Sequence, residues 1–221
     1  MNCKRKQIKR ILSLLLMAVM CLGLSACGDK TPTKEEMLAV AAEFSANEIQ
    51  NDSIDNIVSA KQKFCNTTIS VSGYVRNIEE DHIELSAAYS SNYIVDVYLS
   101  TDELVKLERG QSITVVGTTT DEIIESSENV AEYTFDYNHY QMPVAYLVKD
   151  RVEITGILKG KNYSYKPAYN IKVGDSNVLG LIYFADGVDV STLENGKEAR
   201  FLVKAINNGN GMKYFDAEII G

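Results

Sequence analysis

The chain has 221 residues, of which 45% are hydrophobic, and its 22 basic and 30 acidic side chains give a net charge of −8. Such an acidic balance opposes binding to nucleic acid, which depends on basic side chains. The two histidines, His82 and His139, lie far apart and no His/Cys spacing pattern surrounds them. We therefore expect no metal ion and no cofactor.

The first 27 residues predict a bacterial lipoprotein signal. A basic head without acids precedes an apolar run over 11–22, and Leu24-Ser25-Ala26-Cys27 closes the segment. The run is shorter than the roughly 20 residues that a transmembrane helix needs, so it is typical of a secretory signal. The ending resembles the lipobox, which implies that residues 1–26 are removed and that Cys27 is diacylated, with palmitate among its acyl chains. We expect the protein on the extracytoplasmic face of a bacterial membrane.

Loss of residues 1–26 would leave 17 basic against 30 acidic side chains, a net charge of −13. Anionic head groups would repel such a chain, so the lipid itself has to hold it at the membrane. Cys65 would be the only thiol left besides the lipidated Cys27, so no disulfide is expected. We interpret Cys65 as a small hydrophobic residue at the end of a helix.

Residues 27–33 are expected to form a tether, followed by a helical segment and a first β domain over 34–150. Thr33 is a candidate helix cap, and apolar residues recur at helical spacing from Met37 to Phe44. A second helix is expected over 56–64. The residues Asn51-Asp52-Ser53 between them predict a break or a new cap.

From Thr67 onward the hydrophobic period changes to two, which predicts strands. The expected strands of the first unit are 69–75, His82–Ser86, 93–99, Ser112–Thr118 and 141–148. Ser100 and Glu103 predict a capped helical turn before the fourth strand. The residues Arg109-Gly110-Gln111 predict the turn into it.

The pattern repeats over residues 151–221, where we expect strands at 152–158, 169–173, 178–184, 199–206 and 213–220. Each set of five has a glycine in its first strand, Gly73 and Gly156, where a sharp bend needs the missing side chain. The prediction is a mainly β protein with two small five-stranded OB-like barrels in tandem. Two unrelated meanders with incidental glycines are the alternative.

Three segments of the first unit carry a family resemblance. They are Val71-Ser72-Gly73-Tyr74-Val75, Leu107-Glu108-Arg109-Gly110-Gln111 and Ile113-Thr114-Val115-Val116-Gly117. Residues 36–150 resemble the bacterial OB-fold family described as tRNA-anticodon-binding-like. The resemblance implies a fold and no catalytic residues. The chain departs from the family pattern by a long insertion over 119–140, and its second barrel matches only in outline.

No nucleophile elbow, phosphate-binding loop, zinc motif or paired-cysteine motif is present. The one dense run of carboxylates is Asp121, Glu122, Glu125, Glu128, Glu132 and Asp136. It lacks the alternating ligands and central glycine of a calcium loop. We interpret it as a solvated loop, since charge runs usually face water.

Aromatic residues gather in two connections that OB-folds use for ligands. The candidate binding residues are Tyr133, Phe135, Tyr137 and Tyr140 in the first unit and Tyr163, Tyr165 and Tyr169 in the second. Their rings can stack on sugars, peptides or bases. The alternative is that residues 133–137 extend a hairpin whose rings cover the barrel.

We therefore expect a non-enzymatic, membrane-anchored binding or scaffolding module whose partner is an envelope protein, a peptide or a glycan. One alternative is a nucleic-acid-binding OB protein, which the acidic charge disfavours. The other is a hydrolase that uses carboxylates, which predicts a concave pocket with two facing acids.

Overall fold

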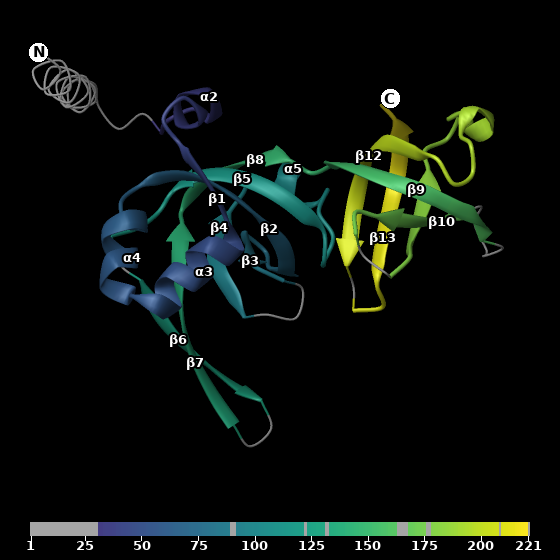
Figure 1. The fold of residues 1–221 in the computed structure, drawn as a ribbon. Helices are drawn as coiled ribbons and strands as arrows, with labels where there is room; N and C mark the ends of the chain where they lie inside the picture. Colours follow the sequence, from purple (N-terminus) through teal and green to yellow (C-terminus); the bar gives the residue numbers. More distant parts are fainter. Residues whose placement is uncertain are drawn as a thin grey trace, which may run out of the picture. The chain divides into compact units, whose positions relative to one another are not determined.

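The computed structural model describes residues 31–88, 92–121, 123–130, 133–162, 168–175, 178–207 and 209–220, and for Tyr93 and residues 125–138 it describes the backbone alone. The signal segment and Cys27 lie outside the described residues. The chain divides into residues 1–33 and 34–221, and every helix and strand described below lies in the second part (Figure 1).

The elements up to residue 150 are α2 (Lys34–Leu38), β1 (Ala42–Ser45), α3 (Ala46–Asp55), α4 (Ile57–Phe64), β2 (Thr68–Ile78), β3 (His82–Ser86), β4 (Tyr93–Tyr98), α5 (Thr101–Leu104), β5 (Ser112–Thr118), β6 (Ile124–Val130), β7 (Tyr133–Met142) and β8 (Val144–Lys149). Those that follow are β9 (Val152–Asn162), β10 (Ala168–Val173), β11 (Gly180–Phe184), the 3-10 turn η1 (Val190–Thr192), β12 (Glu198–Asn207) and β13 (Met212–Ile219). The protein is therefore mainly β, as predicted.

Capping side chains determine where the helices begin. Ser45 and Glu48 form a capping box at the start of α3, and the Asn56 side chain accepts from the Ser59 N–H at the start of α4. Ser100 and Glu103 cap α5 in the same way, and Glu103 Oε1 also accepts from the Leu147 N–H at 2.9 Å. The capped turn predicted at Ser100 is confirmed.

The first sheet has eight strands, in the order β6-β7-β4-β3-β2-β5-β8, with β1 parallel to β2 beside this path. Pro143 alone separates β7, which runs parallel to β4, from β8, which runs antiparallel to β5. Proline has no N–H to donate to a ladder, so it breaks the segment into two strands that serve different neighbours.

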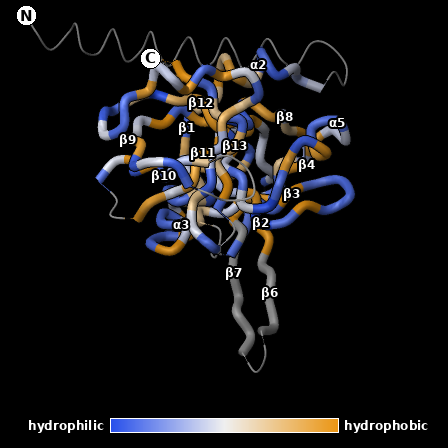
Figure 2. Tube along the Cα trace, turned by 90° about the vertical axis from the view of Figure 1, so that its right-hand side faces the viewer, coloured by the Kyte–Doolittle hydropathy of each residue, from blue (hydrophilic) through white to orange (hydrophobic). Residues whose placement is uncertain are grey.

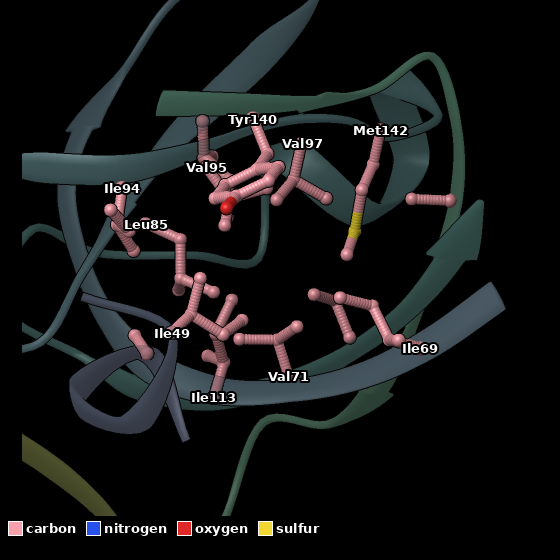
Figure 3. Close-up of a cluster of buried hydrophobic side chains, with 14 of the residues drawn as sticks. Ile49, Ile69, Val71, Leu85, Ile94, Val95, Val97, Ile113, Tyr140 and Met142 are labelled. Carbon is pink, nitrogen blue, oxygen red and sulfur yellow. The ribbon is translucent and has the colours of Figure 1, made fainter. Parts of the chain in front are cut away.

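The core of the first sheet lies between its strands and α3. Figure 3 shows Tyr140 and Met142 of β7 pointing across this core toward Val71 and Ile69 of β2. All four side chains are buried. Along the strands, hydrophobic residues alternate with hydrophilic ones (Figure 2), which leaves one face for the core and one for water.

The strands β9 to β13 close into a five-stranded barrel in the order β10-β11-β13-β12-β9. Its core holds Leu158, Ile171, Ile182, Phe201 and Val203, all buried. The closed five-stranded barrel predicted for residues 151–221 is confirmed as an architecture. In the first unit the predicted five strands are too few, because β1, β6 and the division at Pro143 add three.

One arrangement recurs in both units. The Gly110 N–H donates to the Val75 carbonyl at 2.6 Å, and the Gly196 N–H donates to the Leu158 carbonyl at 3.0 Å. Each acceptor lies two residues after the strand glycine, Gly73 or Gly156. Both turn glycines have positive φ, 80° and 86°, a conformation that glycine adopts without a steric penalty.

Gln111 ties this turn to its surroundings. Its fully buried side chain accepts from the Glu108 N–H and donates to the Asp150 carbonyl, both at 2.9 Å. Its backbone forms an isolated bridge with Ile206 of β12, and the Asn207 N–H donates to the Gly110 carbonyl. The predicted turn therefore also joins the two β units, which the sequence pattern did not indicate.

Two helical predictions are wrong. The helix expected from Met37 to Phe44 ends at Leu38, and Phe44 lies in β1 because residues 42–45 pair with β2. The break expected at Asn51-Asp52-Ser53 lies inside α3, where the Ser53 hydroxyl donates back to the Ile49 carbonyl.

The interpretation of Cys65 is confirmed. It ends α4 and packs, partly buried, against the first core. Burial raises the pKa of its thiol, which favours the neutral form over the reactive thiolate.

Candidate binding surface at the β6–β7 hairpin

The insertion over residues 119–140 contains a β-hairpin, whereas its charge predicted a loop. Its base is closed where the Thr120 N–H donates to the Gln141 carbonyl at 3.0 Å. β6 pairs with β7, and only the end of β7, Tyr140 to Met142, pairs with β4. Figure 1 shows the two strands extending beyond the rest of their sheet.

The register sorts the hairpin positions into two faces. Tyr133, Phe135 and Tyr137 lie opposite Val130, Glu128 and Ser126. Directly opposed residues share a face and neighbours along a strand alternate, so these six positions share one face. The other face carries Thr134, Asp136 and Asn138 opposite Asn129, Ser127 and Glu125. The three aromatic residues therefore occupy one face and none occupies the other.

The structure places the remaining predicted binding residues elsewhere. Tyr140 is a core residue with 1% of its surface exposed, and its hydroxyl lies 3.1 Å from the Ser53 hydroxyl, so its ring is not available to a ligand. Tyr169 is half-buried in β10, with its ring edge-on to Phe184 at 5.6 Å. Tyr163 and Tyr165 lie outside the described residues.

At the root of the hairpin, a buried pair that the sequence did not predict joins β7 to the sheet. His139 Nε2 lies 3.0 Å from Asp96 Oδ2, and the two side chains are 3% and 9% exposed. Asp96 Oδ1 is also buried, with no hydrogen-bond partner among the described atoms. Buried ionisable groups are rarely retained without a partner, so this contact fixes where the hairpin leaves the sheet.

Glu84 lies directly opposite Asp96 on the neighbouring strand. Burial raises the pKa of the Glu84 carboxyl above its ordinary value, and nearby Asp96 raises it further. The Arg76 guanidinium, 3.7 Å away, opposes the shift. Beside them the His82 ring stacks on Tyr98 at 5.0 Å. The root of the hairpin is therefore an acid-rich and partly desolvated face.

Glu84→Gln is expected to gain stability relative to the wild type as pH rises. The folded protein holds the Glu84 proton more tightly than the unfolded chain, so the stability from the neutral carboxyl is present at low pH. It is lost as pH rises through the folded-state pKa, whereas glutamine stays neutral. Urea unfolding at about pH 4 and about pH 7 measures the difference. Glu43→Gln, at an exposed position of β1, is the control, and an equal rise in both variants would contradict the expectation.

A hollow of about 240 Å³ lies at the η1 end of the second barrel. Leu158, Leu193 and Ile219 line it with Glu194 and Glu198. Glu194 is ion-paired with Lys197 at 2.6 Å, both well exposed. Glu84 and Asp96, the facing pair of acids, do not line this hollow.

Within the described ranges, no three His, Cys, Asp or Glu side chains are grouped as metal ligands. No helix in those ranges is long and apolar enough to span a membrane. No family model matches the chain, and no curated protein matches it.

Proposed function

We propose that this chain is a lipid-anchored, non-enzymatic binding or scaffolding module on the extracytoplasmic face of a bacterial membrane. Its partner is an envelope protein, a peptide or a glycan. The observation that carries the proposal is the β6–β7 hairpin, which pairs with its sheet only at the root and has three aromatic positions on one face. A solitary aromatic face of this kind is suited to binding.

We propose further that the two β units are OB-like barrels in tandem. The order β9-β10-β11-β13-β12 is that of a five-stranded Greek-key barrel, with a parallel pair between β11 and β13. In the first unit, β2, β3 and β4 correspond to β9, β10 and β11, and β5 corresponds to β12. The segment that Pro143 divides lies between β4 and β5 in this order, as β13 lies between β11 and β12. The matching glycine contacts at Val75 and Leu158 support this equivalence.

The anchor rests on the lipobox-like ending at Cys27. Cys27→Ala is expected to abolish incorporation of labelled palmitate and to release the protein from stable membrane attachment. Two acyl chains matter, because a single chain binds membranes only marginally. Ser25→Thr, two residues earlier, is the control and should still be labelled. Undiminished labelling of Cys27→Ala would refute the anchor without touching the binding role.

The binding role is tested on the aromatic face of the hairpin. Tyr133→Ser with Tyr137→Ser should reduce photo-crosslinking from a probe placed at Phe135 in living cells by about tenfold, because aromatic anchors dominate most interfaces. The melting temperature should stay unchanged. The matched control changes the opposite face, Thr134→Ala with Asn138→Ala, and should crosslink as the wild type does.

If the rings instead cover the barrel, the tyrosine variant should lose about 1 kcal/mol or more per ring. A stable tyrosine variant with undiminished crosslinking would refute the binding role.

A further inference from the structure

Charge is divided unequally between the two β units. Residues 34–150 contain 21 acidic and 7 basic side chains, whereas residues 151–221 contain 8 acidic and 9 basic. The strong negative charge therefore belongs to the first unit alone, and the second is close to neutral. Within each unit one stretch carries a single sign of charge: residues 119–140 in the first and residues 154–174 in the second.

The negative hairpin is the β6–β7 arm. Residues 119–140 contain six acids and no lysine or arginine. Glu125 and Glu128 lie in β6 and Asp136 in β7, and at the root Asp96 has a buried carboxylate oxygen without a described partner. The described cations near this root are Arg76 beside Glu84, Lys61 close to Cys65, and Lys63, which is paired with Asp52.

The positive hairpin is formed by β9 and β10. Residues 154–174 contain four lysines and no acid. Three of the lysines are described, and we call this set the lysine face: Lys159 and Lys161 of β9 are exposed, and Lys172 of β10 is partly exposed. The register pairs Lys172 with Ile157 and Lys161 with Tyr169, so the set follows the length of the hairpin and does not lie on one side of the sheet. β9 carries an extra residue here, at Lys159 and Gly160, and Gly160 has a φ of 105°. Such bulges re-aim side chains at the edges of sheets.

The lysine face differs from the other described basic residues of its barrel except Lys213 of β13, which likewise has no ion-pair partner there. Arg151, Lys197, Arg200 and Lys204 each lie 2.6–2.9 Å from a carboxylate. Lys159, Lys161 and Lys172 have no such partner among the residues that the structure describes. Four basic residues are thus neutralised within the molecule, while three lysines of one hairpin remain available to an outside anion.

We propose that the lysine face of one molecule binds the acidic β6–β7 arm of a second copy, so that the protein self-associates head to tail. This proposal rests on the proposed role of the β6–β7 hairpin as a binding arm. The two surfaces have opposite charge, and each belongs to an aromatic-rich β-hairpin. A single contact between two copies would therefore give both surfaces a partner. A contact between two different surfaces is heterologous, so it builds rings or open chains of copies.

The first test is sedimentation velocity of the full chain in a nonionic detergent. The wild type should form oligomers at about 100 µM, a usual range for weak contacts. Raising NaCl from about 50 mM to about 500 mM should weaken the association by about tenfold or more, because salt screens exposed charges. A wild type that stays monomeric at low salt would overturn the proposal.

The second test reverses the charges of each surface separately. Lys159→Glu with Lys161→Glu and Lys172→Glu should be monomeric. An arm variant with Glu125→Lys, Glu128→Lys and Asp136→Lys should be monomeric too. A mixture of the two variants should associate, since each again meets an opposite charge. Failure of the mixture to associate, or association of either variant alone, would overturn the proposal.

A matched control changes the same number of acids elsewhere on the first unit. Glu35→Lys with Glu43→Lys and Asp55→Lys alters three exposed positions and shifts net charge as much as the arm variant does. This control variant should associate as the wild type does. If it stays monomeric, net charge alone explains the monomeric arm variant, and the proposal is overturned.

Other ligands of the lysine face give distinct results. A monomeric wild type that binds anionic vesicles or a polyanion through Lys159, Lys161 and Lys172 would refute a second copy as the occupant. The binding role of the arm is judged separately by the crosslink at Phe135. A wild type that crosslinks to another envelope protein but stays monomeric would keep the proposed function and overturn self-association.

Discussion

Valine at position 73 is expected to destabilise the first β unit by about 2–4 kcal/mol. A Cβ at Gly73 would lie 2.8 Å from the Ser86 carbonyl oxygen and 3.0 Å from both Ala46 Cβ and Leu85 Cγ. The nearest atom belongs to the backbone of β3, so it cannot move aside without breaking the ladder between β2 and β3. Chemical denaturation of the variant measures the loss.

Ser72→Val is the control for this substitution. Position 72 lies next to Gly73 on the opposite, exposed face of β2, where valine suits a strand and loses only the contact between Ser72 and Thr114. Its effect should stay within about 1 kcal/mol. A Gly73→Val protein as stable as the control would show that no close approach is needed there.

Gly156→Val should cost its barrel less, about 1–3 kcal/mol. The nearest atoms to a Cβ at Gly156 are Cδ1 and Cγ1 of Ile171, at 2.7 and 2.8 Å, followed by the Lys172 carbonyl oxygen at 3.0 Å. A side chain can change rotamer, whereas a backbone carbonyl cannot. If Gly73→Val loses more stability than Gly156→Val, crowding against the backbone is the cause of the larger loss.

His139→Ala is expected to cost about 3–5 kcal/mol, because it removes the partner of a buried carboxylate. Asp96 is 6% exposed and would lose its described contact. The loss should appear in thermal or urea unfolding, and as faster hydrogen exchange at the root of β7. Adding Asp96→Asn to this variant should recover part of the loss, since no buried charge remains.

His82→Ala is the matched control at a less buried pair. His82 Nδ1 lies 2.8 Å from Asp81, but the Asp81 side chain is 71% exposed and stays hydrated without it. Exposed pairs of this kind contribute about 1 kcal/mol or less. Equal losses for His82→Ala and His139→Ala would contradict the special role of the pair at the hairpin root.

Regular alternation let the sequence predict most strands. His82–Ser86 and Ser112–Thr118 have the predicted bounds, because one residue in two points into a core and the pattern is local. The prediction was wrong where a distant partner decides the structure. Phe44 continues a helical spacing, yet it lies in β1, paired with Val71, and packs edge-on to Phe64 at 5.2 Å.

The candidate surface was predicted only in part, for the same reason. The aromatic alternation from Tyr133 to Tyr137 is visible in the sequence, but the acids among these residues hide the hairpin, since acids are poor strand formers. The contact between Asp96 and His139 has no local signal, because parallel pairing of β4 and β7 brings together residues far apart in the chain. Gln111 was likewise visible as a turn residue and not as the joint between the two units.

The base of the β6–β7 hairpin has a consequence for how such a protein changes over time. The bond from the Thr120 N–H to the Gln141 carbonyl holds the two ends of the insertion together, and β5 and β8 pair on the near side of it. The hairpin beyond the buried residues Ile123, His139 and Tyr140 can lengthen, shorten or be exchanged without altering the distance that the sheet has to span. The arm is thus an insertion that can vary in evolution, and homologues of this chain can acquire new partners while their barrels are retained.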